Sequence, residues 1–190
     1  MDMLGNLMGD FRKYLRDTLL PDALQGAIAA HCRVDLYTDN HIIIKELKPI
    51  FSSPRRRLAG LIIDVSFDHF LSRHWQLFNC IERGEFIRKA YRCLSEQLWM
   101  MPPPMQRTVT AMIEQDWLGS YEQIEGVERA LDGIARRIRF RNCLQGAGVE
   151  VRDNYATLEN AFLEFYPQLQ EYVRSWPREP AWFEPARPEC

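Results

Sequence analysis

Long hydrophobic runs are missing from this 190-residue chain, and so are the usual marks of a secreted or metal-thiolate protein. No stretch of 18 apolar residues occurs, so no transmembrane helix is expected. Asp2 and Asp10 interrupt the amino-terminal segment, which has no long apolar stretch after a basic start, so no signal peptide is expected either. The five cysteines are odd in number and form no C-x-x-C motif. This favours reduced thiols in a cytoplasmic protein over a disulfide framework or a zinc knuckle.

Charge of one sign is not in excess. The chain has 24 basic and 26 acidic residues and a net charge of −2, which gives no global argument for a nucleic acid or membrane partner. Basic residues still gather locally, at Arg55–Arg57 and at Arg136–Arg141. Apolar residues make up 46% of the chain, enough for a core, and the length predicts one domain rather than two small ones.

Alternation of apolar and polar residues, which is typical of strands, is weak along the whole chain, and 35–44 is the one ambiguous stretch. Helical spacing dominates instead, and the segments expected to be helical are 7–15, 22–36, 42–51, 58–75, 85–99, 105–117, 124–139 and 151–176. The pattern predicts an all-α fold, a single-domain helical bundle of about seven or eight helices over residues 1–176. An irregular Pro-rich tail is expected over 177–190.

Aspartate and histidine are frequent on the apolar segments of the first 75 residues. Three pairs lie four residues apart, a spacing that puts both side chains on one helix face: His31 with Asp35, Asp35 with Asp39, and Asp64 with Asp68. His69 follows Asp68 directly, about 100° round the helix. Buried carboxylates and imidazoles are costly without partners. A mixed set of this kind without thiolates suits Mn²⁺, Fe²⁺, Zn²⁺ or Mg²⁺ in a hydrolase.

Each of these residues also has a purely structural interpretation. His31 could be a core histidine bonded to Asp35, and Asp10 could be a helix cap after Gly9. Asp68 could form a surface ion pair with Arg73, which would contribute little. Two further alternatives remain open: His74 at the end of an amphipathic helix, and Arg136–Arg141 as a solvated face.

The chain resembles the acyl carrier protein phosphodiesterases, also called holo-acyl carrier protein hydrolases, at four places. The matching residues are Gly5-Asn6-Leu7-x-x-Asp10-Phe11, then His31-x-Arg33-x-Asp35-x-x-Thr38-Asp39-Asn40, then Asp64-x-x-x-Asp68-His69-Phe70-Leu71-Ser72-Arg73-His74-Trp75, and finally Tyr155, Leu158, Glu159, Phe162 and Phe165-Tyr166-Pro167. The resemblance covers most of the chain, is specific in the first 75 residues and is looser from 76 to 150. It implies an all-helical, HD-domain-like fold, divergent from the HD phosphohydrolases.

The resemblance also implies an activity in fatty acid and lipid metabolism. The expected reaction is hydrolysis of the phosphodiester between a serine of acyl carrier protein and 4′-phosphopantetheine, with a divalent cation, Mn²⁺ by preference and Mg²⁺ or Fe²⁺ as alternatives. The partner would be a small, strongly acidic helical protein, with no nucleic acid and no membrane, and the oligomeric state is left open. Basic residues that could steer this partner are Lys13, Arg16, Arg55–Arg57 and Arg136–Arg141.

The predicted site combines carboxylates, imidazoles and guanidinium groups. The expected metal ligands are Asp10, His31, Asp35, Asp68 and His69, and the expected catalytic residues are Asp10, His31, Arg33, Asp68, His69, Arg73 and His74. A bound cation would lower the pKa of a water molecule. Arg33 or Arg73 would hold a non-bridging phosphoryl oxygen, and His74 would protonate the leaving alkoxide.

Two other functions remain as alternatives. An HD-like nucleotide phosphohydrolase would share the metal chemistry but not the protein partner. A non-catalytic helical binding module is the second alternative. It would apply if the chain lacked the apolar, histidine-bearing segment that precedes the Gly5 string in family members and if that segment supplied metal ligands.

Overall fold

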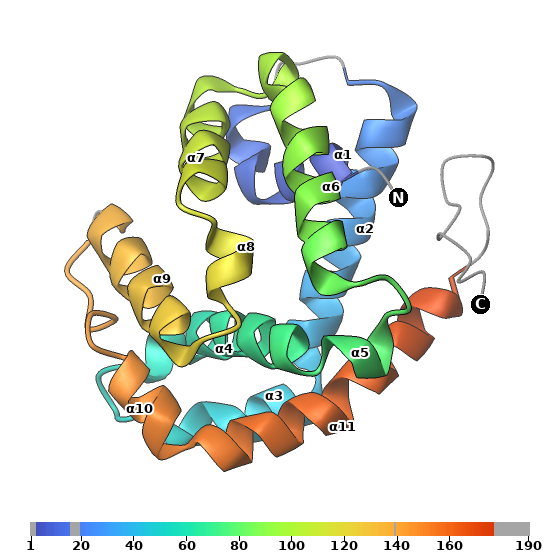
Figure 1. Ribbon diagram of the computed structural model, residues 1–190. Coiled ribbons are helices and arrows are strands. Elements are labelled where there is room, and N and C mark those ends of the chain that lie inside the picture. Colours follow the sequence, from blue (N-terminus) through green and yellow to red (C-terminus); the bar gives the residue numbers. More distant parts are fainter. Residues whose placement is uncertain (1–2, 16–19, 139, 177–190) are drawn as a thin grey trace.

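The computed structural model describes residues 3–15, 20–138 and 140–176, and every regular element in these residues is a helix (Figure 1). The α-helices are α1 (Met3–Met8), α2 (Asp22–Asn40), α3 (Ile42–Leu47), α4 (Ala59–Arg73), α5 (Trp75–Phe78), α6 (Arg83–Glu96), α7 (Pro103–Glu114), α8 (Trp117–Ser120), α9 (Ile124–Arg137), α10 (Gly148–Asp153) and α11 (Tyr155–Arg174). The 3₁₀ helices are η1 (Gly9–Tyr14), η2 (Lys48–Ile50), η3 (Arg56–Leu58) and η4 (Leu98–Met100).

The larger of two apolar clusters is built on α4, most of whose apolar residues are buried. Ile62, Ile63 and Phe70 of this helix are fully buried, and α9 and α11 both pack against it. Figure 1 shows α11 running below α4 at the base of the view. Burial of each large apolar side chain contributes about 1.5–3 kcal/mol. These contacts fix the rotation of α4 about its axis, and with it the direction of the polar residues that α4 carries.

A smaller apolar cluster joins α1, α2, α6 and α7, with Leu4, Met8 and Met105 among its fully buried members. Helix α1 approaches α2 closely because Gly5 has no side chain: a Cβ there would lie 2.7 Å from the Cβ of Ala27. This close packing places η1, which follows α1 without a gap, beside α2.

The all-α prediction is confirmed for the described residues, which contain no strand. The ambiguous stretch 35–44 is helical on both sides of His41, whose extended backbone separates α2 from α3. No helix within the described ranges is long and apolar enough to cross a membrane. The predicted tail at 177–190, together with Arg16 and Arg139, lies outside the described residues.

Two predicted helices are divided in the structure. The segment 58–75 breaks at His74, between α4 and α5, and the segment 151–176 lies across a break at Asn154, between α10 and α11. The Asn154 side chain donates a hydrogen bond of 2.8 Å to the carbonyl of Glu150, a local contact that competes with helix continuation. Such breaks, and single-turn helices such as α5 and α8, account for more helices than the seven or eight expected.

Candidate active site

Gly9 allows Asp10 and His31 to meet. It begins η1 directly after α1, and its backbone lies against the imidazole of His31 on α2. A Cβ on Gly9 would lie 2.1 Å from Cδ2 of His31, far closer than any real contact. Only glycine permits this approach, which carries Asp10 to the edge of the imidazole.

His31 contacts polar atoms at both ring nitrogens. Nε2 lies 3.1 Å from Oδ2 of Asp35 and 3.5 Å from Oδ1 of Asp10, and Nδ1 lies 3.3 Å from Oδ1 of Asn6. The hydrogen bond with Asp10 raises the pKa of His31 above 6.5 against the opposing effect of burial, and the charges of both carboxylates add to the rise. The ring therefore links two aspartates that come from different elements.

Both of these aspartates line a cavity of about 430 Å³. Its polar lining comes from three elements: η1 supplies Asp10, α2 supplies Asp35, Thr38 and Asp39, and α4 supplies Asp64 and Asp68. The i,i+4 spacing within α2 and within α4 places each pair of carboxylates on the face that borders the cavity. We call this space the acidic cavity.

The α4 carboxylates resist ionisation. Their side chains are open to solvent within the cavity, yet the surrounding protein displaces much of their water. Burial, and then the charges of Asp64 and Asp10, raise the pKa of Asp68 from 3.8 to about 7. Burial is the main cause that raises the pKa of Asp64 from 3.8 to about 6, and the charge of Asp39 is the largest contribution from a neighbouring residue.

Nearby basic groups balance only part of this negative charge. Nζ of Lys48 lies 3.9 Å from Oδ1 of Asp39 and lowers the pKa of Asp64. Carboxylate oxygens are the ligands that Mg²⁺ and Mn²⁺ prefer, so the donor set fits such a cation. Within the described residues, no three Asp, Glu, His or Cys side chains form a group able to hold a metal ion as they stand, so the carboxylates would have to close on it.

The rest of the cavity wall is apolar. Helix α11 supplies Phe162, Phe165, Tyr166 and Leu169, and Phe67 of α4 packs edge-on against Phe162 with ring centroids 5.4 Å apart. Burial raises the pKa of Tyr166, and the charge of Asp68 adds to the rise. The cavity thus combines carboxylates with a hydrocarbon surface.

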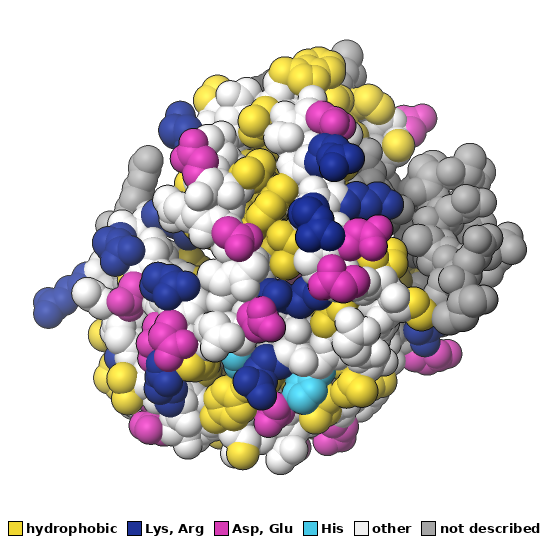
Figure 2. Space-filling model, in the orientation of Figure 1, with side chains coloured by type: hydrophobic (Ala, Val, Ile, Leu, Met, Phe, Trp, Pro, Cys, Tyr) yellow, Lys and Arg dark blue, Asp and Glu magenta, His cyan; other side chains and the backbone are white. Residues whose placement is uncertain are grey.

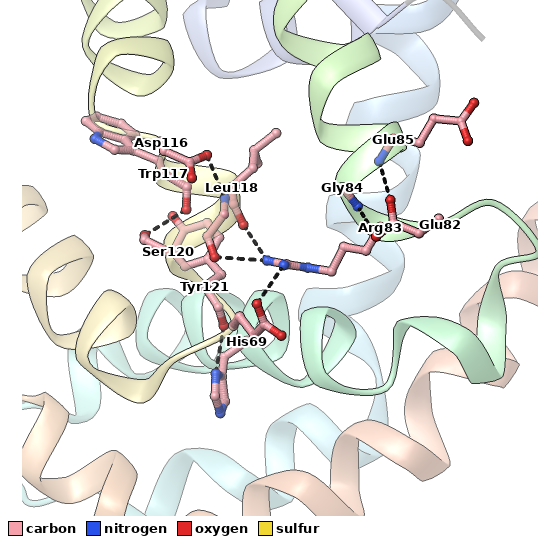
Figure 3. Close-up of polar contacts among 12 residues, drawn as sticks. His69, Glu82, Arg83, Gly84, Glu85, Asp116, Trp117, Leu118, Ser120 and Tyr121 are labelled. Atoms are coloured by element: carbon pink, nitrogen blue, oxygen red, sulfur yellow. Dashed lines mark hydrogen bonds and ion pairs between the residues drawn. The ribbon is translucent and has the colours of Figure 1, made fainter.

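His69 does not join this set. Its side chain is 1% exposed, Nδ1 lies 2.8 Å from the carbonyl oxygen of Tyr121 (Figure 3), and Nε2 lies 2.9 Å from the hydroxyl of Tyr155. These partners suit a neutral ring that donates from Nδ1 and accepts at Nε2, and burial lowers the pKa of His69. Both nitrogens are engaged, so the structure does not place His69 beside Asp68 at the acidic cavity. The ring instead joins α4 to Tyr121, directly after α8, and to α11.

Three other predicted catalytic residues also lie away from the acidic cavity. Nε2 of His74 is 2.7 Å from Oε1 of Glu159, and the guanidinium of Arg33 lies 4.0 Å from the ring centroid of Trp176. Arg73 is exposed at the end of α4. The expected phosphate contacts of Arg33 and Arg73 and the expected acid role of His74 therefore have no support from their placement.

The structure brings together Asp10, Asp35 and Asp68 at the cavity and places His31 in contact with the first two. It adds Asp39 and Asp64, which the sequence analysis noted for their spacing without assigning them to the site. It also adds the α11 wall, for which the helical period of Phe162, Phe165, Tyr166 and Leu169 was a signal of burial only.

Comparison with known proteins identifies the family. The sequence model of a family described as "Acyl carrier protein phosphodiesterase" matches residues 1–169. The chain belongs to this family. Relatives of that name include a protein of Enterobacter sp. (strain 638), 33% identical over 172 residues that cover 90% of this chain and 89% of the relative. A Klebsiella pneumoniae protein is 34% identical over 90% of this chain and 89% of the relative. An Escherichia coli O157:H7 protein is 34% identical over 87% of this chain and 86% of the relative. No solved structure matches the chain.

Proposed function

We propose that this chain hydrolyses the phosphodiester between a serine of holo-acyl carrier protein and 4′-phosphopantetheine, releasing apo-acyl carrier protein and free 4′-phosphopantetheine. The family supports the substrate. One structural observation carries the reaction class: five aspartates from η1, α2 and α4 line a single cavity of the size that binds small ligands.

The proposal includes a divalent cation, with Mn²⁺ first and Mg²⁺ or Fe²⁺ as alternatives. A phosphodiester is an anion and would be repelled by the acidic cavity unless positive charge intervened. Asp10, Asp35 and Asp68 would hold the cation, with Asp64 beside them. When bound, such an ion lowers the pKa of a water molecule and neutralises charge on phosphoryl oxygens.

The other residues position the carboxylates and shield the phosphate from water. His31 is not part of the cavity wall, but it contacts Asp10 and Asp35 and so fixes the direction of both carboxylates. Asn6 meets the far nitrogen of the ring and restrains its rotation. The α11 wall displaces water from the phosphate and offers an apolar surface to the hydrocarbon part of pantetheine.

The proposal is tested by intact mass spectrometry of holo-acyl carrier protein incubated with the chain. We expect loss of the phosphopantetheine mass with Mn²⁺ and no loss with EDTA. Asp68→Asn should abolish the loss, whereas Asp153→Asn, an exposed carboxylate on α10 outside the cavity, should retain it. No mass loss with Mn²⁺ would overturn the reaction, and equal loss in EDTA would overturn the cation. A nucleotide panel in the same buffer detects the alternative phosphohydrolase.

A cytoplasmic location belongs to the same proposal. Cys32 and Cys143 are free thiols in the structure. Unpaired cysteines are the usual state in a reducing compartment, and they support this placement.

A further inference from the structure

A second depression of the surface lies between η1, α7, α8 and α9, outside the acidic cavity. Its volume is about 1120 Å³, and its lining holds basic and aromatic side chains and no acidic one. Lys13, Arg107 and Arg137 supply the positive charge, and Tyr14 and Trp117 supply flat apolar surface. Figure 2 shows Lys and Arg side chains over α9, at the left of this face. We call this depression the basic groove.

The charges of the basic groove are not neutralised within the described part of the chain. None of Lys13, Arg107 and Arg137 forms an ion pair with a described residue. Lys13 lies 4.9 Å from the ring centroid of Tyr14, and Arg137 lies 5.1 Å from that of Trp117. Such contacts contribute about 0.5–1 kcal/mol at exposed sites and leave the charge available to a partner.

Arg55–Arg57 is the other basic cluster expected to meet a partner. Unlike the cations of the basic groove, its first residue, Arg55, is already paired within the protein. The guanidinium of Arg55 pairs with Glu150 and donates hydrogen bonds of 2.9 Å and 3.0 Å to the carbonyls of Cys143 and Gln145. These contacts span about 90 residues of sequence and tie the loop before η3 to the segment around α10. Arg55 therefore stabilises the fold and is not free for an acidic partner.

The basic groove and the acidic cavity are linked through η1. The 3₁₀ helix η1 contributes Asp10 to the cavity and Lys13 to the groove, three residues apart; at a rise of about 2 Å per residue, these positions are separated by ~6 Å along the helix axis. Tyr121 lines neither depression, but a charge from each acts on its hydroxyl. Burial raises the pKa of Tyr121, the charge of Asp68 adds to the rise, and the charge of Arg137 opposes it.

We propose that the basic groove docks an acidic helix of the carrier-protein substrate while the phosphodiester of the same molecule reaches the acidic cavity. The identity of the partner rests on the function proposed above. An α-helix with its side chains is about 10–12 Å wide, so an open groove of this volume accommodates one of its faces. The groove cations attract the body of an acidic protein that the cavity carboxylates alone would repel, and the adjacency lets one bound substrate reach both sites.

Binding of apo-acyl carrier protein tests docking without catalysis, because this form has no phosphopantetheine to lose. With fluorescently labelled apo protein at low salt, Lys13→Glu, Arg107→Glu and Arg137→Glu should each weaken binding on the order of 10-fold. The loss should shrink as salt is raised, because screening shortens the range of the charges. Arg129→Glu makes the same charge change at an exposed α9 position outside the groove and should alter affinity by less than about 2-fold.

Each outcome decides one of the two proposals. Affinity unchanged in all three groove variants, an equal loss in Arg129→Glu, or no apo-protein binding by the wild-type chain overturns the docking surface. If binding depends on the groove but no phosphopantetheine is released, the proposed hydrolysis is refuted and the docking surface stands. If phosphopantetheine is released but binding does not depend on the groove, the docking surface is refuted and the hydrolysis stands. Rescue of Arg137→Glu by a Glu→Lys change in the partner's acidic helix would show that the variant is folded and that the contact is direct.

Discussion

Replacement of Asp68 by asparagine should make the metal-free protein more stable at neutral pH. Burial, followed by the charges of Asp64 and Asp10, holds the pKa of Asp68 at about 7 in the folded chain, against 3.8 for a solvated carboxyl. Between these values the folded chain binds more protons than the unfolded chain, so the free energy of unfolding falls as pH rises through this window. Asparagine keeps the shape of the side chain, carries no charge and removes this loss.

The size of the gain follows from the two pKa values. Their difference of about 3 corresponds to ~4 kcal/mol above pH 7, at about 1.36 kcal/mol for each pKa unit. The Asp68 side chain is open to solvent in the acidic cavity, and screening by water reduces the expected gain to ~1–2 kcal/mol. In a chain of this length each kcal/mol raises the melting temperature by about 2–4 °C.

Thermal unfolding followed by circular dichroism in EDTA measures the effect. We expect Asp68→Asn to melt above the wild-type chain at pH 8, by less at pH 5, and at about the same temperature near pH 4, whereas Asp153→Asn should show no such trend. With Mn²⁺ the order should reverse at pH 8, because the proposed cation would stabilise the wild-type carboxylates. An Asp68→Asn gain that is absent at pH 8, or that does not vary with pH, would refute the account of a cavity with unbalanced negative charge.

Three other substitutions test individual contacts. Gly9→Ala should drive a methyl group into the His31 ring, cost about 1–3 kcal/mol in a urea melt and lower turnover by displacing that ring; wild-type stability would disprove the close approach. His69→Gln should flatten the loss of stability as pH falls below 6.5, because burial lowers the pKa of His69 and the unfolded chain then takes up the proton first; an unchanged slope would contradict this. Arg55→Ala should cost about 1–3 kcal/mol, because Glu150 loses its ion pair and keeps only the hydrogen bond from the Ser52 backbone, with little change in KM for holo-acyl carrier protein; a raised KM at full stability would make Arg55 a docking residue instead.

Helical periodicity was sufficient to predict the all-α fold but not every helix end. The predicted segment 58–75 contains α4 because its apolar residues recur at helical spacing and most of them are buried. The start of α6 at Arg83 was placed two residues late, because the cap is the side chain of Glu82, which accepts hydrogen bonds from the backbone of Gly84 and Glu85. Glutamate is not among the usual cap residues, so local sequence gave no signal there.

The site was predictable where it depends on spacing within one helix and not where it depends on distant partners. His31 contacts Asp35 as their separation of four residues requires. The direction of His69 depends instead on the carbonyl of Tyr121 and the hydroxyl of Tyr155, which are 52 and 86 residues away along the chain. No pattern around Asp68 and His69 reveals these contacts, so adjacency in sequence could not show that the two side chains meet different surroundings.

The position of η1 has a consequence for substrate selection. One short 3₁₀ helix borders both depressions, and the hydrogen bonds of a 3₁₀ helix are weaker than those of an α-helix, so a small shift of this helix costs little. A protein that pulls on Lys13 would move Asp10 as well, and the reactive centre would then respond to the macromolecule that carries the scissile bond. Small synthetic phosphodiesters lack that handle and should be hydrolysed slowly even at concentrations that fill the cavity.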